Sequence, residues 1–176
     1  MKGEVFLINT LLVDDEPLIL QGLQALVDWN SLGCELVGTA RNGEEALNRF
    51  EDVPCDLVIT DIKMPKMDGL MLIKEWQQNQ PKTKWIVLSG YKDFDYVKQG
   101  LLLGIENYLV KPVNEKELIT SIEQVKKKLQ ETYQYSLSRS ILRDNAVWSY
   151  LHDQIDQADC EERMALCDVG IPEGVA

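Results

Sequence analysis

Short apolar runs and helix-like patterns alternate along the chain from about residue 10 to residue 131. Continuous apolar runs of this kind are typical of strands that are buried on both faces of a parallel sheet. The runs predict five strands, which end at Val13, Ala40, Asp61, Ser89 and Lys111. Apolar residues at helical spacing follow each strand, so the chain is predicted to consist of five strand–helix units.

The predicted helices begin at residues suited to capping. Asn42 and Asp93 can cap the second and fourth helices, and Asn114 with Glu117 resembles a capping box for the fifth. Pro17 stands in the first turn of the first helix, where its missing N–H breaks no hydrogen bond. The apolar positions predicted for that helix are Leu18, Leu20, Leu23, Leu26 and Val27.

Five such units with short connections predict an α/β fold. We expect a doubly wound five-stranded parallel sheet with helices on both faces and right-handed crossovers. In open sheets of this kind, ligands bind outside the carboxyl ends of the strands. The polar residues at the predicted strand ends are therefore the candidates for function.

The pattern changes toward the C-terminus. A helical seam with apolar residues spaced 4-3-4 could either lie on its own domain or pair with a second copy. Its members are Leu118, Ile122, Val125 and Leu129. Beyond Leu129 the apolar residues drift around the helix and need cover, which favours dimerisation there. These residues are Tyr133, Leu137, Ile141 and Trp148.

These patterns predict three parts. Residues 1–9 form a leader, and residues 10–131 form the main domain. Residues 132–176 form a C-terminal helical extension, which we interpret as a linker followed by the start of a missing output region.

Composition narrows the class of protein. The chain has 176 residues, of which 45% are hydrophobic and 27% charged, as is ordinary for a globular domain. Its net charge of −11 argues against a basic nucleic-acid surface, so DNA would be contacted only through a missing C-terminal domain. The four cysteines are scattered and His152 is the one histidine, which disfavours a zinc site or a disulfide framework.

The sequence predicts no association with a membrane. No apolar run approaches the ~20 residues of a membrane span. The run at residues 5–8 is too short for a secretory signal and is interrupted by Asn9 and Thr10. We therefore expect a cytoplasmic protein.

The strand ends carry groups suited to phosphoryl transfer. Asp14 and Asp15 follow the first strand, and Asp61, Ser89 and Lys111 end the third, fourth and fifth. Asp15 and Asp61 suit Mg²⁺ directly, with Asp14 holding a metal-bound water, and the lysine and hydroxyl can bind phosphoryl oxygens. Any one of these residues alone would be interpreted as a helix cap or a solvated loop residue. Together they predict a Mg²⁺-dependent site in which one of the aspartates accepts a phosphoryl group.

The same segments resemble a known family. Residues 12–16, 60–69, 89–90 and 108–112 are similar to the hallmark motifs of the receiver domain of two-component response regulators. The resemblance covers about residues 10–131 and implies the flavodoxin-like strand order 2-1-3-4-5. It also implies that a sensor histidine kinase is the partner that donates the phosphoryl group.

The resemblance implies a role for each acidic residue of the site. Asp61 would be the phosphoacceptor. Mg²⁺ would be bound by Asp14, Asp15 and Asp61, with the backbone carbonyl of Lys63 as a further ligand. Lys111 would contact the phosphoryl group.

The resemblance also implies a switch. Ser89 would supply the switch hydroxyl and Tyr108 the switch aromatic ring, and the bond from Lys111 to Pro112 would be cis. Their movement would change the face formed by the fourth helix, the fifth strand and the fifth helix. A homodimer could form through that face or through the extension of the fifth helix.

A narrower resemblance concerns the output. Residues 28–33, 40–47 and 89–96 resemble receivers that are attached to AraC-type helix-turn-helix domains. This implies transcription regulation through a DNA-binding domain. Such a domain does not follow within the 176 residues.

Two other functions stay open. A stand-alone receiver that passes phosphate onward is disfavoured by the long C-terminal helix, which a shuttle does not need. A Mg²⁺-dependent aspartyl-phosphate phosphatase would resemble a motif with a second acidic residue two positions after Asp61, where this chain has Lys63. We therefore expect a phospho-accepting signalling module and not an enzyme.

Overall fold

The computed structural model describes residues 7–50, 52–90, 94–151 and 157–168. The predicted cap Asp93 and the histidine His152 lie outside the described residues, as does most of the predicted leader. The chain divides into two compact units, Met1–Lys127 and Lys128–Ala176.

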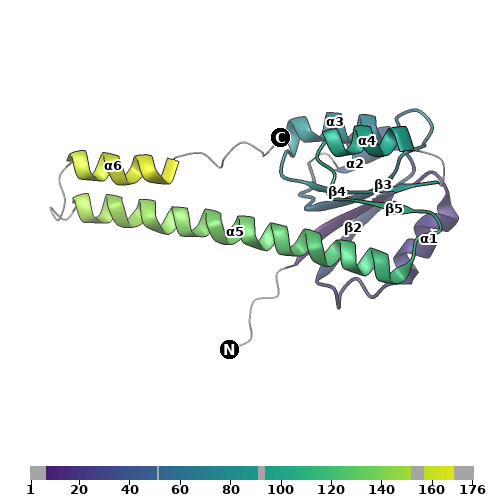
Figure 1. The fold of residues 1–176 in the computed structure, drawn as a ribbon, viewed down its shortest axis with the longest axis horizontal. Coiled ribbons are helices and arrows are strands. Elements are labelled where there is room, and N and C mark those ends of the chain that lie inside the picture. The colour runs from purple at the N-terminus through teal and green to yellow at the C-terminus, as the bar shows by residue number, and fades with distance from the viewer. Residues whose placement is uncertain (1–6, 51, 91–93, 152–156, 169–176) are drawn as a thin grey trace. The chain divides into compact units, whose positions relative to one another are not determined.

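The first unit contains a five-stranded parallel sheet. The strands are β1 Ile8–Val13, β2 Cys34–Ala40, β3 Leu57–Asp61, β4 Lys84–Ser89 and β5 Asn107–Val110. Their spatial order is β2-β1-β3-β4-β5, which confirms the predicted doubly wound fold (Figure 1). Strand β5 ends one residue before the expected Lys111, although the Lys111 N–H still donates to the Ser89 carbonyl at 2.8 Å.

The strand register brings the carboxyl ends of the strands to one edge of the sheet. Val13 of β1 pairs with Thr60 of β3, and Asp61 pairs with Leu88 of β4. Ser89 follows Leu88 directly. The residues that end neighbouring strands therefore stand at nearly the same level.

Helices cover both faces of the sheet. Figure 1 shows α2, α3 and α4 on one face, with α1 and the first part of α5 on the other. The helices are α1 Pro17–Leu26, α2 Gly43–Phe50, α3 Gly69–Asn79, α4 Phe94–Leu102, α5 Glu115–Leu151 and α6 Gln157–Asp168.

Two of the predicted helix caps are confirmed. The Asn42 side chain accepts a hydrogen bond from the Glu45 N–H at 3.0 Å, at the start of α2. The Asn114 side chain accepts one from the Lys116 N–H at 2.9 Å, at the start of α5. Each cap satisfies an N–H that has no partner within its helix.

A hydrophobic core fills the space between the sheet and α2, α3 and α4. Trp76 of α3 and Trp85 of β4 are its largest side chains, and their rings pack edge to face with centroids 6.0 Å apart. Close packing of this kind gives each strand end a defined position. Other members of the core are Leu11, Val13, Ala46, Phe50, Val58, Ile62, Leu70, Ile73 and Val87.

The prediction that Leu18 belongs to the apolar face of α1 is wrong. Leu18 is 79% exposed, whereas Leu20 and Leu23 are buried. Successive helical residues are separated by about 100°, so Leu18 lies on nearly the opposite side of α1 from Leu20. The buried face is set by Leu20 and Leu23, and Leu18 faces outward.

The first part of α5 packs on its own domain. Leu118, Ile122 and Val125 are all buried within the first unit. Of the two possibilities that the sequence left open for this seam, packing on the parent domain is therefore right as far as Val125. The seam residues up to Val125 are not a free surface for a second copy.

The part of α5 in the second unit carries exposed apolar residues. They are Tyr133, Leu137, Ile141 and Trp148, with exposed fractions of 57%, 48%, 52% and 62%.

Among the described residues, no helix combines the length and the apolar character that crossing a membrane requires. Cys34 and Cys55 are buried and carry free thiols.

Candidate functional site

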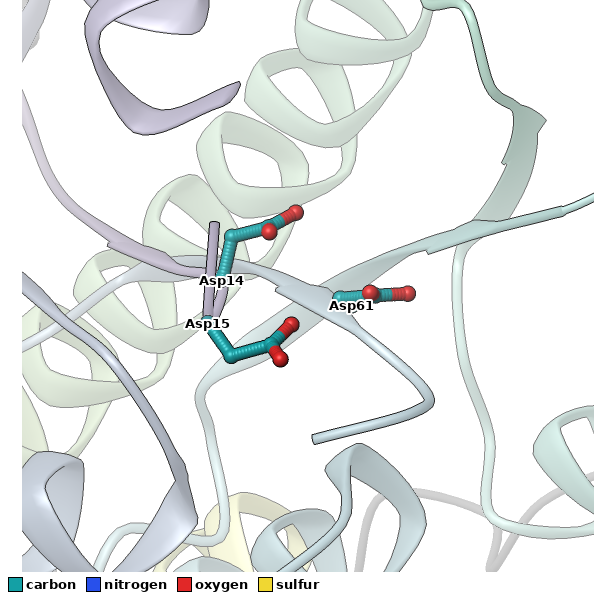
Figure 2. A group of neighbouring side chains, drawn as sticks. All are labelled: Asp14, Asp15 and Asp61. Carbon is teal, nitrogen blue, oxygen red and sulfur yellow. The ribbon is translucent and has the colours of Figure 1, made fainter. Parts of the chain in front are cut away.

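Three carboxylates meet at the carboxyl edge of the sheet. Asp14 and Asp15 follow β1 and Asp61 ends β3, and one oxygen of each lies within 4.8 Å of those of the other two. Figure 2 shows the three side chains beside one another. Asp14 is fully buried and Asp61 is 7% exposed, while Asp15 is more open. The structure thus brings together the three acids that the sequence singled out.

The ammonium of Lys111 joins this group from the end of β5. Its Nζ lies 2.7 Å from Asp14 Oδ2 and 2.8 Å from Asp61 Oδ2. Among the described residues, Asp14 Oδ2 accepts no hydrogen bond of good geometry, so its contact with Lys111 is an ion pair. Glu16 Oε1, at 3.9 Å from Nζ, is a further acid near the lysine that the sequence did not single out.

Burial and charge shift the pKa values of this group. Burial raises the pKa of Asp14, and the nearby Lys111 offsets only part of that effect. Burial by itself would lower the pKa of Lys111, but its bonds to Asp14 and Asp61 outweigh burial and the net shift is upward. Lys111 is therefore charged at neutral pH, and burial makes the ionised form of Asp14 less favourable than that of an exposed carboxyl.

Backbone amides orient two of the carboxylates. The Glu16 N–H donates to Asp14 Oδ1 at 3.0 Å, and the Ile62 N–H donates to Asp61 Oδ1 at 2.7 Å. In both residues the second oxygen, Oδ2, is the one beside Lys111. The local backbone therefore holds one oxygen of each carboxylate and leaves the other for a cation.

Gly69 allows the loop after Asp61 to pass close to the site. A Cβ at Gly69 would lie 2.1 Å from the backbone oxygen of Asp61, which no side chain could tolerate. The Gly69 N–H donates to the Ile62 carbonyl at 2.9 Å, and Asp68 caps α3 by accepting the Met71 N–H at 2.8 Å. A glycine can mark a close backbone approach, although no role for Gly69 was predicted from the sequence.

Ser89 ends β4, which neighbours β3, and Tyr108 stands on β5, the strand beyond β4. Ser89 is buried, and its hydroxyl donates to the Gly90 carbonyl at 3.2 Å. Tyr108 is half-buried and packs against the hydrophobic core. Their switching roles stay predictions. The bond between Lys111 and Pro112 is cis, as the resemblance implied.

Lys63 contacts an aromatic ring that the sequence analysis did not identify. Its Nζ lies 5.5 Å from the centroid of the Tyr96 ring on α4, within the range of a cation–π contact. Both residues line a cavity of about 390 Å³, together with Ile62, Met64 and Asp68. The contact joins a loop to a helix far along the chain, and no local pattern signals it. The role of the Lys63 carbonyl as a metal ligand stays a prediction.

The donor set fits a hard divalent cation. All three acids offer carboxylate oxygens, which Mg²⁺ prefers. Asp14 Oδ2 is buried and lacks a well-formed hydrogen bond, so it can accept another cation. A divalent ion would also relieve the mutual repulsion of the three acids.

Comparisons with known proteins agree with this geometry. Residues 10–123 match the family described as the response regulator receiver domain. The transcriptional regulatory protein YesN of Bacillus subtilis is 45% identical over 115 residues, which cover 65% of this chain and 31% of YesN. The chain thus spans about a third of the length of this curated relative.

Solved structures show the same fold. The receiver domain of AraT, a response regulator from Geobacillus stearothermophilus, is 35% identical with a TM-score of 0.69, and the match covers 72% of this chain and 98% of that one. A CheX–CheY complex with BeF3 and Mg from Borrelia burgdorferi gives 28% identity and a TM-score of 0.61, with coverage of 67% and 88%. Fold, site and relatives agree, and the chain belongs to the response regulator receiver domain family, whose members are signalling domains and not classical enzymes.

Proposed function

We propose that this chain is the phospho-accepting receiver of a response regulator, in which Asp61 takes a phosphoryl group from a histidine of a sensor kinase. The P–N bond of the phosphohistidine breaks, and a P–O bond to a carboxylate oxygen of Asp61 forms. The transferring group carries negative charge on its oxygens, so catalysis depends on positioning and on cations. Lys111, whose Nζ lies 2.8 Å from Asp61 Oδ2, would bind one of those oxygens.

Asp14, Asp15 and Asp61 would hold Mg²⁺, with the Lys63 carbonyl as a further ligand. The bound ion would supply positive charge that offsets the charge of the acids and of the phosphoryl group. The close approach of the three carboxylates supports this assignment. So does the related CheX–CheY complex, whose description includes Mg and BeF3.

The observation that carries the proposal is the contact of one ammonium with two carboxylates from different strands. Lys111 reaches Asp14 and Asp61 at once, although β1, β3 and β5 are far apart in the sequence. A lysine without a role in the site would be expected to extend into solvent, whereas Lys111 contacts two buried carboxylates.

Incubation with acetyl phosphate and Mg²⁺ tests the proposal by intact mass. We expect wild type to gain one phosphate, and Asp61→Asn to gain none. Asp56→Asn is the matched control and should gain one phosphate, as wild type does. Asp56 lies just before β3, at the end of the strand opposite Asp61, where it accepts the Asn9 N–H at 2.8 Å. Phosphate on Asp61→Asn, or none on wild type, would contradict the proposal.

Ser89 and Tyr108 would convert the phosphate into a change of surface. The hydroxyl would turn toward the phosphoryl oxygens and leave room for the ring to move inward, altering the face formed by α4, β5 and α5. Ser89→Ala is expected to accept phosphate but to lose phosphate-dependent association. Normal association of that variant would remove Ser89 from the switch.

The output would be control of transcription. YesN is a transcriptional regulatory protein, and this chain corresponds to about a third of its length. A DNA-binding domain of the AraC type would therefore lie outside the 176 residues. DNA footprinting with the product of the whole gene, with and without phosphorylation, tests this. DNA binding that is the same in both states would contradict it.

A homodimer would form through the exposed residues of α5. Tyr133, Leu137 and Ile141 are about half exposed and recur every four residues, as in a ridge that packs against another helix. Sedimentation of the chain with and without the residues after 131 tests this. Monomers in both cases would contradict dimerisation through α5.

A further inference from the structure

A bridge of side chains ties β5 to α5. Asn107, the first residue of β5, donates from Nδ2 to Ser121 Oγ at 2.7 Å, and Ser121 donates to the Glu117 carbonyl at 2.8 Å. Through Oδ1, Asn107 also accepts the N–H of Tyr108 at 2.8 Å. The two side chains together therefore link the backbone of β5 at Tyr108 with the backbone of α5 at Glu117.

The chemistry of the groups fixes the direction of each bond. The Tyr108 N–H can only donate, so the oxygen of the Asn107 amide must face it. The amide nitrogen then faces Ser121, whose hydroxyl can accept this bond while it donates its own proton to Glu117. Each group in the bridge has a complementary partner. Reversing the amide would break its bond to the Tyr108 N–H, and Ser121 could then bond the amide oxygen only by giving up its bond to Glu117.

Ser121 is a polar residue in the middle of the buried face of α5. It is 1% exposed, and the neighbouring buried positions Leu118, Ile122 and Val125 are apolar. Apolar contacts alone tolerate small shifts of a helix along a sheet, whereas the partly buried hydrogen bond between Asn107 and Ser121 depends on distance and direction. The bridge therefore sets the register of α5 on β5.

Strand β5 depends on this tie because it is an edge strand. It pairs with β4 on one side, and none of the described residues forms a strand on its other side. Tyr108 and Lys111, the predicted switch ring and the lysine of the site, stand within and just after it. A displacement at the carboxyl end of β5 would act on α5 through Asn107.

We propose that Asn107 and Ser121 are positioning residues that couple phosphorylation at Asp61 to α5. This inference rests on the function proposed above, and it adds the contact by which the change would leave the site. None of the hydrogen bonds that form the bridge involves the acids of the site or Lys111. Removing the bridge should therefore spare phosphorylation and abolish the response of α5.

Hydrogen exchange of the whole chain, with and without acetyl phosphate and Mg²⁺, tests the coupling, and intact mass reports phosphorylation in the same samples. In wild type we expect a several-fold change in exchange for residues 115–127 on phosphorylation. In Ser121→Ala we expect full phosphorylation and no such change. As a single substitution in wild type, Asn107→Asp should keep the response, because the Ser121 hydroxyl can turn and donate to the new carboxylate.

Thr120→Ala is the matched control. Thr120 makes the same kind of bond to its own helix, donating to the Lys116 carbonyl at 2.8 Å, but it is exposed and has no part in the bridge. It should respond as wild type does. A thermal unfolding scan first establishes that Ser121→Ala folds, and Asn107→Leu replaces it if it does not, with the same expected result.

The outcomes separate this inference from the proposed function. A phosphorylated wild type whose α5 does not respond, or a response that survives loss of the bridge, overturns the coupling alone. Loss of the response in Thr120→Ala as well overturns it too, because the effect is then not specific to the bridge. A wild type that takes up no phosphate overturns the proposed function and the coupling with it.

Discussion

The ammonium of Lys111 lies 2.7 Å from an oxygen of Asp14 that is fully buried. The same ammonium lies 2.8 Å from Asp61. Without a divalent ion, this lysine is the main positive charge that offsets the acids at the carboxyl edge of the sheet. The stability of the domain should therefore depend on both Lys111 and the available cation.

Replacing Lys111 by methionine should destabilise the domain by about 3 kcal/mol at neutral pH without Mg²⁺, because two buried carboxylates lose their partner. Urea unfolding measures the effect. Lys66→Met is the control, since Lys66 lies 3.8 Å from Glu44 in an exposed pair whose loss should be close to neutral. Equal effects of the two substitutions would contradict the importance of the buried pair.

Replacing Asp14 by asparagine should stabilise the domain in Mg²⁺-free buffer at neutral pH. The pKa of Asp14 is raised on folding, so its ionised form disfavours the native state, and the penalty grows as pH rises above 3.8 toward the folded pKa. Below 3.8 the carboxyl is protonated in both states, and the difference between variant and wild type should vanish. Thermal unfolding from pH 3 to pH 8 measures it.

Mg²⁺ provides the control for the same variant. Saturating Mg²⁺ should raise the melting temperature of wild type, because an ion that binds only the native state stabilises it. Asp14→Asn should gain much less. A variant that is less stable than wild type at every pH would contradict the argument from the pKa of Asp14.

Replacing Gly69 by alanine should be severely destabilising, because the added Cβ would lie 2.1 Å from the Asp61 carbonyl oxygen. We expect a loss of about 2–4 kcal/mol together with loss of phosphorylation, since the loop can relax only by moving away from Asp61. Gly22→Ala is the matched control. Nothing lies within 4 Å of a Cβ at Gly22 in α1, so that change should stabilise the domain by about 0.5–1 kcal/mol.

Replacing Trp76 by phenylalanine should destabilise the domain more than the same change at Trp85, by about 1 kcal/mol. Both rings are buried and lose similar volume. Trp76 Nε1 donates to Thr83 Oγ1 at 3.2 Å, whereas among the described residues Trp85 Nε1 has no acceptor. Urea unfolding of the two variants side by side measures the difference, and an equal loss would contradict it.

The sheet and the acids of the site could be anticipated from local pattern. Apolar runs end at Val13 and Asp61 because buried parallel strands are apolar throughout and give way to polar residues where they leave the core. A parallel arrangement then brings all the carboxyl ends to one edge. The meeting of Asp14, Asp15 and Asp61 follows from that arrangement alone.

Contacts between different elements could not be anticipated in this way. The approach of Gly69 to the Asp61 carbonyl, the position of Lys63 over Tyr96 and the bond from Asn107 to Ser121 leave no periodic signal. Each depends on where a loop or helix comes to rest on the sheet. Leu18 belongs with them, since its outward position depends on which face of α1 the sheet covers.

For this protein, the amino-acid sequence by itself determined the alternation of strands and helices, the ends of four of the five strands and the family to which the chain belongs. Burial and alternation are local properties, and they repeat along every element. The tertiary structure alone decided that α5 packs on its own domain up to Val125, that Lys111 reaches two acids and that Asn107 joins β5 to α5. These contacts depend on packing in three dimensions, where a difference of a few ångströms separates a hydrogen bond from no interaction.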